Sequence, residues 1–276
     1  MKEKGKAMKE LKGVVDTLYF PLYARIEISK NFPEYFYDER ALSIEALLPE
    51  EIKAGASEYS NMDSAARYFS MDRLTAPFIE EHSNCNLVYL GAGLETAYDR
   101  LKKRVNTEHV QVYQLDLHQA IETRRTVLGQ AVGEVLLAED MFEFTWIERM
   151  DKSLPTLLVA AGVFQYFEEE IILAFIKGLK ESFPKCELLF DATNEKGLAY
   201  ANWFLRRTGN KDVQMHFFIN DGDAFAKRTS TSLLKEQVFF REARAMLGKK
   251  LKRMTRLFMK VADAKKRTMI YHLKLN

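Results

Sequence analysis

The feature that most constrains the fold is an apolar run that ends in a turn with two glycines. Residues 87–90 read Leu-Val-Tyr-Leu, and the turn Gly91-Ala92-Gly93 follows and opens into a helical pattern. A second apolar run, from Val110 to Leu115, ends in Asp116. On a parallel α/β sheet, this layout brings glycine backbone and a carboxylate to the carboxyl ends of neighbouring strands, where nucleotide-type ligands bind. We therefore predict such a site; a plain strand–helix turn without a ligand is the alternative.

The residues around the turn distinguish between ligands of this kind. The dinucleotide fingerprint has a third glycine three residues after the second, and this chain has Thr96 there. A P-loop is excluded because no Gly-Lys-Ser/Thr follows the turn. Glu95 places an acid within the loop, which disfavours a phosphate and favours a ligand with positive charge. S-adenosylmethionine carries a ribose, a sulfonium and an ammonium, so it fits these residues better than NAD.

The chain downstream of Cys85 alternates between strand and helix patterns. Strands are predicted at Asn86–Leu90, Val110–Leu115, Glu134–Ala138, Thr156–Ala160, Glu187–Asp191, Glu236–Phe240 and Met269–Leu275. Helices are predicted between them at Glu95–Arg104, His118–Leu128, Phe142–Met150 and Glu168–Ser182. Alternation of this kind favours right-handed crossovers and helices on both faces of a sheet. We predict an α/β, Rossmann-like fold whose seven-stranded, mostly parallel sheet has an antiparallel last strand.

The chain is expected to divide into a small helical part and a larger α/β part. Residues 1–12 are rich in Lys and Glu and are predicted to form a flexible N-terminus. Residues 13–83 show helical patterning without clear strand alternation, which indicates an N-terminal helical cap. Residues 84–276 form the predicted Rossmann-like core, with a cap insertion near 194–232.

Composition excludes several classes of protein. The chain has 276 residues, 47% of them hydrophobic, and a net charge of +2, so it can bury a full core and has no global charge that favours nucleic acid. No Cys-x-x-Cys occurs, and the five histidines do not pair at metal-ligand spacing, so we expect no metal. Cys85 and Cys186 are expected to be free, buried thiols. The apolar runs are too short to span a membrane, and the N-terminus lacks the apolar core of a signal peptide, so we expect a cytoplasmic protein without a membrane partner.

Short motifs spread over almost the whole chain resemble those of one family. They are Gly13-Val14-Val15-Asp16-Thr17-Leu18 with Tyr23-Ala24-Arg25, Asp38-Glu39-Arg40-Ala41, Ala66-Arg67 with Met71-Asp72, Leu90–Thr96, Asp116-Leu117 with Arg124-Arg125, Gly162-Val163 with Tyr166, and Leu188–Asp191. In this order and spacing they are similar to the leucine carboxyl methyltransferase and TcmP-like O-methyltransferase family, a branch of the class I S-adenosylmethionine-dependent methyltransferases. The resemblance implies methyl transfer to a carboxylate or hydroxyl, with S-adenosylhomocysteine as product. The expected acceptor is a small, polyketide-like molecule rather than a protein carboxylate.

The resemblance also implies a set of site residues. The expected cofactor-binding residues are Arg67, Gly91, Ala92, Gly93, Glu95, Asp116, Leu117, Asp140, Met141, Ala161 and Gly162. Within this set, Arg67 matches the arginine that meets the cofactor's carboxylate, Asp116 matches the ribose ligand, and Asp140-Met141 resembles the place where the fold holds adenine. The catalytic residue is not identified. Tyr166, His118 and His216 are the candidates if a hydroxyl acceptor needs a base.

Three positions depart from the family's pattern. The arginine that normally follows the glycine-loop threonine is Ala97, the glutamate before Gly162 is Ala161, and the proline after Asp116-Leu117 is His118. If the missing glutamate normally receives the cofactor's ammonium, either Glu95 compensates or affinity for the cofactor is reduced. The alternative function is therefore a catalytically weakened or inactive protein that binds S-adenosylmethionine or S-adenosylhomocysteine.

A basic segment near the C-terminus supports a second alternative. The stretch 244–260 contains Lys249, Lys250, Lys252, Arg253, Arg256 and Lys260. Its apolar residues Leu247, Leu251, Met254, Phe258 and Val261 recur at helical spacing, which predicts one helix packed on the sheet with a solvated basic face. An RNA methyltransferase that binds its substrate through this helix is the alternative, although a nucleic-acid partner is not the expected one. The oligomeric state is not predicted.

Overall fold

The computed structural model describes residues 18–49, 52, 57–129, 132–207 and 214–276. Its centre is a seven-stranded sheet with the strand order β3-β2-β1-β4-β5-β7-β6. The strands are β1 (Cys85–Leu90), β2 (Val110–Asp116), β3 (Glu134–Ala138), β4 (Thr156–Ala160), β5 (Cys186–Thr193), β6 (Ser232–Val238) and β7 (Thr268–Lys274). β7 runs antiparallel to both of its neighbours, whereas β1 to β5 pair in parallel, which confirms the predicted fold class. The predicted flexible N-terminus and the Gly13–Thr17 motif lie outside the described residues.

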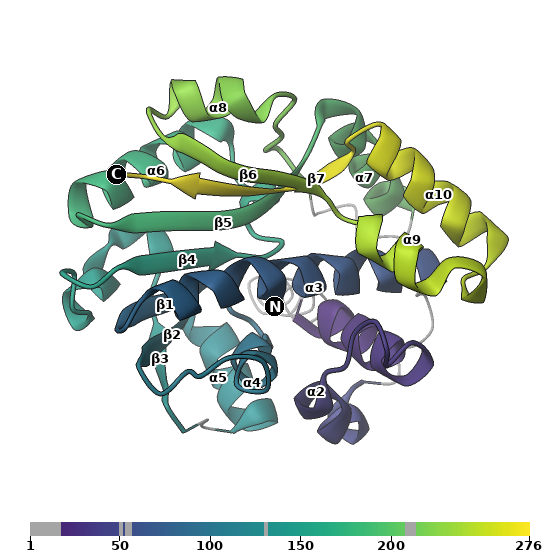
Figure 1. Cartoon of the computed structure of the whole chain (residues 1–276), viewed down its shortest axis with the longest axis horizontal. Helices are drawn as coiled ribbons and strands as arrows, with labels where there is room; N and C mark the ends of the chain where they lie inside the picture. Colours follow the sequence, from purple (N-terminus) through teal and green to yellow (C-terminus); the bar gives the residue numbers. More distant parts are fainter. Residues whose placement is uncertain (1–17, 50–51, 53–56, 130–131, 208–213) are drawn as a thin grey trace, which may run out of the picture.

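The sheet is covered on both faces, because alternate residues of its central strands pack into two separate cores. Leu87, Val112 and Leu157 pack with helix α3 (Glu58–Glu81) on one face. Val88, Leu115 and Leu158 pack on the other face with α6 (Glu169–Ser182). Figure 1 shows α3 crossing in front of the sheet. α6 is at the left of the picture and packs on the opposite face of the sheet. Burial on both faces explains why β1 and β4 are apolar runs without polar alternation.

The carboxyl ends of β1, β2 and β4 lie at one edge of the sheet, since these strands are parallel and adjacent. Helix α4 (Ala97–Leu101) follows β1, and α5 (His118–Leu128) follows β2 at the bounds that the sequence predicts. The 3-10 helix η5 (Phe164–Tyr166) follows β4 and precedes α6. The glycine turn, Asp116 and the Ala161-Gly162 segment therefore meet at the same edge of the sheet, as expected from the strand order.

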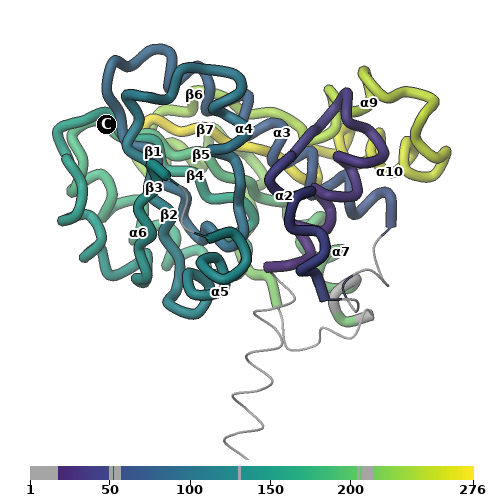
Figure 2. The backbone as a smooth tube through the Cα atoms, turned by 90° about the horizontal axis from the view of Figure 1, so that it is seen from below, coloured from purple at the N-terminus to yellow at the C-terminus, as the bar shows by residue number. Residues whose placement is uncertain are grey.

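The N-terminal part of the described chain is helical and packs directly on the glycine turn. It contains a helix over residues 18–31, the short α2 (Glu39–Ser43), the 3-10 helix η1 (Glu45–Leu47) and α3. Leu22 and Ile26 form a small core with Leu94 of the glycine turn and Leu128 at the end of α5. Figure 2 shows these purple segments beside α9 (Arg241–Leu247) and α10 (Arg253–Ala264). Lys250, which lies between these two helices, pairs with Glu34. The helices thus cover the edge of the sheet that carries the glycine turn.

Two predicted elements differ from the structure between β3 and β4 and at the sheet edge. The predicted helix Phe142–Met150 is two 3-10 helices, η3 (Met141–Glu143) and η4 (Thr145–Arg149), because Phe144 takes a left-handed conformation with φ 59°. The strand predicted at Glu236–Phe240 lies earlier, at β6. This edge strand is only partly buried, so it lacks the apolar run of a central strand, whereas Phe239 and Phe240 are buried beyond its end.

The prediction of one basic helix over 244–260 is wrong. The segment forms α9 (Arg241–Leu247), a 3-10 turn η6 (Gly248–Lys250) and α10 (Arg253–Ala264), and Gly248 ends α9 with φ 47°. Leu247 and Leu251 are buried as expected, but Met254 and Phe258 of α10 are exposed to solvent. They belong to a different side of the segment because the break at Gly248 changes the direction of the chain.

The segment predicted as a cap insertion near 194–232 contains two helices, α7 (Glu195–Arg207) and α8 (Gly222–Arg228). α8 packs on β6, and its Phe225 enters the core on the α6 face. Both cysteines are buried with free thiols, and burial raises the pKa of the Cys85 thiol to about 11. Among the helices of the described residues, none has the length and apolarity needed to cross a bilayer.

The start of α7 provides a test of the packing between β5 and β7. Gly197→Ala would normally stabilise a helix by about 1 kcal/mol. Here an added Cβ would lie 2.5 Å from the backbone oxygen of Arg267, which precedes β7, so the backbone must move. We expect a net loss of about 1–3 kcal/mol in the free energy of unfolding, measured by urea denaturation. An unchanged or higher urea midpoint would show that this contact does not constrain α7.

Candidate functional site

The glycine turn after β1 has a conformation that only glycine adopts easily. Gly91 and Gly93 have φ values of 60° and 45°, in the left-handed region. A Cβ at Gly91 would lie 2.6 Å from a methyl of Val163, and one at Gly93 would lie 2.9 Å from Leu18. The turn therefore fits closely between the segment after β4 and the first helix. Ala92, between the two glycines, is buried.

Asp116 joins the end of β2 to this turn. Its Oδ2 accepts a hydrogen bond of 2.7 Å from the backbone N–H of Gly93, and its Oδ1 accepts one of 2.7 Å from Leu117. Burial raises the pKa of Asp116, while the two backbone hydrogen bonds and Arg124 lower it. The carboxylate is partly exposed and retains lone pairs beyond those two bonds, so it is suited to accept hydrogen bonds from ligand hydroxyls. Leu117 itself has an exposed side chain.

A second group of contacts forms at the ends of β4 and β5. The carboxylate of Asp191 accepts a hydrogen bond of 2.6 Å from the backbone N–H of Gly162 and one of 3.0 Å from Nε of Arg67. Gly162 has φ 71°, and a Cβ there would lie 2.9 Å from Nη1 of Arg67. Burial alone would lower the pKa of Arg67, but Asp191, Asp63, Tyr68 and Tyr166 raise it above its usual value. Arg67 is therefore a fixed, charged group beside Gly162, with Tyr166 in its electrostatic surroundings.

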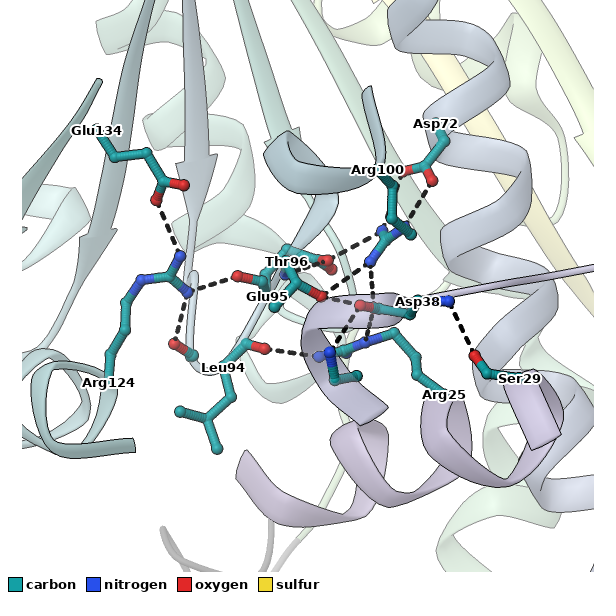
Figure 3. A network of polar contacts seen from close by, with 12 residues as sticks. Arg25, Ser29, Asp38, Asp72, Leu94, Glu95, Thr96, Arg100, Arg124 and Glu134 are labelled. Atoms are coloured by element: carbon teal, nitrogen blue, oxygen red, sulfur yellow. Dashed lines mark hydrogen bonds and ion pairs between the residues drawn. The ribbon is translucent and has the colours of Figure 1, made fainter. Parts of the chain in front are cut away.

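The side chain of Glu95 belongs to a buried ion network rather than to an open edge of the loop. Its Oε1 accepts a hydrogen bond of 2.7 Å from the N–H of Thr96 and pairs with Nη2 of Arg100 at 3.0 Å. Figure 3 shows Glu95 and Thr96 at the centre of this network, between Arg100 and Arg124. Arg124 of α5 donates to the backbone oxygens of Gly93 and Glu95 and pairs with Glu134 of β3. These bonds connect the backbone of the glycine loop to α5 and β3 and hold it in place.

Arg100 is the centre of the network. Its guanidinium forms two hydrogen bonds to Asp72 of α3, of 2.7 and 3.0 Å, and one of 2.7 Å to Asp38. The Oδ2 of Asp38 also accepts bonds from Arg25 and from the hydroxyl of Thr96. Burial would raise the pKa of Asp38, but Arg100 and Arg25 lower it below its usual value. The helical cap is thus joined to the glycine loop by buried charges.

The sequence motifs contain these network residues but assign them no role. Arg25, Asp38 and Asp72 are each part of a family-like motif, yet nothing in their spacing shows that they meet. Arg100 lies one helical turn after Ala97, which is buried in the core on the α3 face. A guanidinium is therefore present in this region although position 97 lacks the family's arginine.

The remaining predicted residues lie around the same edge with different exposure. Asp140 caps η3 by accepting a hydrogen bond of 2.9 Å from the N–H of Phe142, and Met141 is buried next to it. His118 is exposed at the start of α5. His216 lies beside η5, because its backbone N–H donates to Gln165, and its Nδ1 lies 2.7 Å from Oε1 of Glu168. Ala161 is partly buried against the core. No group of three potential metal ligands occurs within the described part of the chain.

The network predicts a large cost for the loss of Arg100. In Arg100→Met, the carboxylates of Asp38, Asp72 and Glu95 would remain buried without their shared cation. Breaking a buried ion pair in this way costs about 3–5 kcal/mol, and we expect at least that loss by urea denaturation at pH 7. The control is Lys103→Met, which removes an exposed pair with Glu39 and should cost less than about 1 kcal/mol. Similar small losses in both variants would contradict a central role for Arg100.

Comparison with known proteins agrees with this geometry. The leucine carboxyl methyltransferase family model matches residues 32–180. TcmP, a tetracenomycin polyketide synthesis O-methyltransferase from Streptomyces glaucescens, is 23% identical over 141 residues, which are 50% of this chain and 51% of TcmP. The chain thus matches only about half the length of this curated relative.

Two solved structures share the fold over nearly their whole length. A DUF574-family protein from Streptomyces avermitilis has a TM-score of 0.61 at 14% identity, over 91% of this chain and 96% of that one. A candidate methyltransferase from Thermobifida fusca has a TM-score of 0.56 at 14% identity, over 91% and 93% of the two chains. The family model covers more than half of the residues and includes the glycine turn, Asp116 and Gly162. The chain therefore belongs to the leucine carboxyl methyltransferase family.

Proposed function

We propose that the protein transfers a methyl group to an oxygen atom of a small, polyketide-like molecule. The observation that carries this proposal is the match to TcmP, which spans half of this chain. The site supports it, because the turn that would hold the cofactor is fixed by buried contacts and a histidine–carboxylate pair lies beside η5. S-adenosylmethionine supplies the reaction with a methyl group on a positively charged sulfur.

The residues at the sheet edge fit this cofactor. The left-handed glycines leave no side chain on the turn, and an added Cβ at Gly91, Gly93 or Gly162 would meet a neighbouring group. Asp116 would accept hydrogen bonds from the ribose hydroxyls, and Arg67 would pair with the carboxylate of the amino-acid end. Asp140 and Met141 would border the adenine after β3. The buried network under Glu95 and Thr96 keeps the loop in one conformation, which reduces the cost of binding.

Among the three candidate bases, we propose His216, because it has a carboxylate partner. Glu168 lies 2.7 Å from its Nδ1, which orients the ring and leaves Nε2 for an acceptor hydroxyl. A carboxylate orienting a histidine is a common arrangement for general-base catalysis. Tyr166 lies on η5 between Gln165, which bonds to His216, and Glu168. This arrangement favours a hydroxyl acceptor, since a carboxylate acceptor needs no base.

The cofactor site is tested by Asp116→Ala. Loss of the carboxylate removes the proposed ribose contacts and frees the N–H of Gly93. We expect affinity for S-adenosylhomocysteine to fall by about 1–3 kcal/mol in isothermal titration calorimetry, the range for unpaired buried polar groups. Asp151→Ala is the matched control, because Asp151 is exposed and its carboxylate bonds only to Ser153 within the described chain. Unchanged affinity in Asp116→Ala would show that the ribose lies elsewhere.

The acceptor side is tested by His216→Gln, with His118→Gln as the matched variant. We expect His216→Gln to lower the methylation rate of a phenolic acceptor by about 10²–10⁴-fold at neutral pH, the usual contribution of a general base. The loss should shrink as the pH approaches about 10, where a phenol ionises without help. His118→Gln should retain activity. A protein that methylates a carboxylate equally well with and without His216 would contradict the proposed hydroxyl chemistry.

A further inference from the structure

Helix α3 carries an acidic and a basic side chain that lie near the ends of β4 and β5. Asp63 and Arg67 are four residues apart on α3, so they lie on the same side of the helix, one turn from each other. Arg67 is fixed by its hydrogen bond of 3.0 Å to Asp191 and lies against the face of Phe239, with 5.7 Å between the guanidinium carbon and the ring centre. The position of Asp63 beside this arginine is therefore defined by regular helix geometry and by a neighbour that is itself fixed.

Asp63 adds a negative charge that the other groups do not neutralise. Asp191 and Arg67 already form an ion pair, so the three side chains together carry one excess negative charge when Asp63 is ionised. Asp63 is partly buried and makes no hydrogen bond to the described residues. Burial raises the pKa of Asp63, Arg67 lowers it and Asp191 raises it, and the net result is a pKa of about 6. A carboxylate in such surroundings is stabilised by a ligand that brings a positive charge.

The other acids at this edge of the sheet are already engaged. Glu95 pairs with Arg100 and accepts a hydrogen bond from the backbone N–H of Thr96. Asp116 accepts hydrogen bonds from the backbone N–H groups of Gly93 and Leu117. Asp191 holds both Gly162 and Arg67. Position 161, which precedes the glycine packed against Arg67, has an alanine and supplies no charge. Asp63 is thus the carboxylate next to Arg67 that forms no hydrogen bond or ion pair with the described residues.

We propose that Asp63 binds the ammonium group of S-adenosylmethionine, beside Arg67, which binds its carboxylate. An α-amino acid group presents one positive and one negative charge on the same carbon, and a carboxylate and a guanidinium one helical turn apart are complementary to it. S-adenosylmethionine carries a net charge of +1, which matches the excess negative charge of Asp63, Asp191 and Arg67. In this chain, α3 therefore supplies the charge that position 161 lacks. The inference rests on the proposed cofactor site.

The test compares two ligands that differ in the amino-acid end. S-adenosylhomocysteine has it, whereas 5′-methylthioadenosine retains the adenosine and the sulfur but has no ammonium or carboxylate. We expect Asp63→Asn to weaken S-adenosylhomocysteine binding by about 10- to 150-fold, the range for a hydrogen bond to a charged group, with affinity for 5′-methylthioadenosine unchanged in calorimetry. Asp63→Glu should recover part of the affinity. Glu80→Gln, at an exposed position of the same helix, is the control and should change neither affinity.

The Tm of the ligand-free protein gives a second readout. If Asp63 binds a ligand, Asp63→Asn should raise the Tm, whereas loss of a structural residue should lower it. The pKa of Asp63 is raised from 3.8 to about 6 in the folded protein, so the stability that its neutral form provides is lost as the pH rises through this range. Asp63→Asn should therefore raise the Tm of the ligand-free protein at pH 7–8. A residue that stabilises the fold would instead lower the Tm on substitution.

Each outcome decides between the two proposals. If wild-type protein binds neither ligand, the proposed cofactor site and this inference both fail. If wild-type protein binds both ligands and Asp63→Asn binds S-adenosylhomocysteine unchanged, only the role of Asp63 is wrong. An equal loss for both ligands, together with a lower Tm, would show that Asp63 supports the fold rather than the ammonium.

Discussion

The buried pairing of Arg100 with Asp38, Asp72 and Glu95 is the interaction on which the rest of the site depends. It joins three parts of the chain that are distant in sequence: the N-terminal cap, α3 and the glycine loop. Buried charges are stable only when their partners satisfy them, so the three segments must fold together. The position of the loop backbone, and hence of Asp116 and the ends of the strands, follows from this shared requirement.

The same helix α3 serves the two sides of the site in different ways. Asp72, near its middle, is satisfied by Arg100 and contributes to the fold. Arg67 and Asp63, at successive turns before it, face Asp191 and the segment after β4. Satisfied ion pairs rigidify a structure, whereas an acid without a partner costs stability and is available to a ligand. One helix therefore combines a structural anchor with the two residues that we propose to bind a zwitterionic group.

The structure shows which charged residues lie near the two positions where the family's charged residues are replaced by alanine. Ala97 is buried in a well-packed core, and the guanidinium of Arg100 comes from the following turn of α4. Position 161 has an alanine in place of the family's glutamate, and we propose that Asp63 of α3 supplies the carboxylate beside Arg67. A charge missing at one position of a site can be supplied by another segment only if the fold brings that segment close, and Arg67 shows that α3 lies beside Asp191 and Gly162.

The sequence by itself determined the parallel sheet, the glycine turn after β1 and the acid after β2. These features depend on local patterns: apolar runs buried on both faces, glycines with left-handed φ and a polar residue at a strand end. Only the tertiary structure decided the partners of Glu95 and the meeting of Asp63 and Arg67, which are neighbours on α3, with Asp191. Contacts between segments depend on packing and charge compensation across the whole chain, which local spacing does not encode. For this reason Glu95, which looks like a ligand-facing acid in sequence, is a buried partner of Arg100 in space.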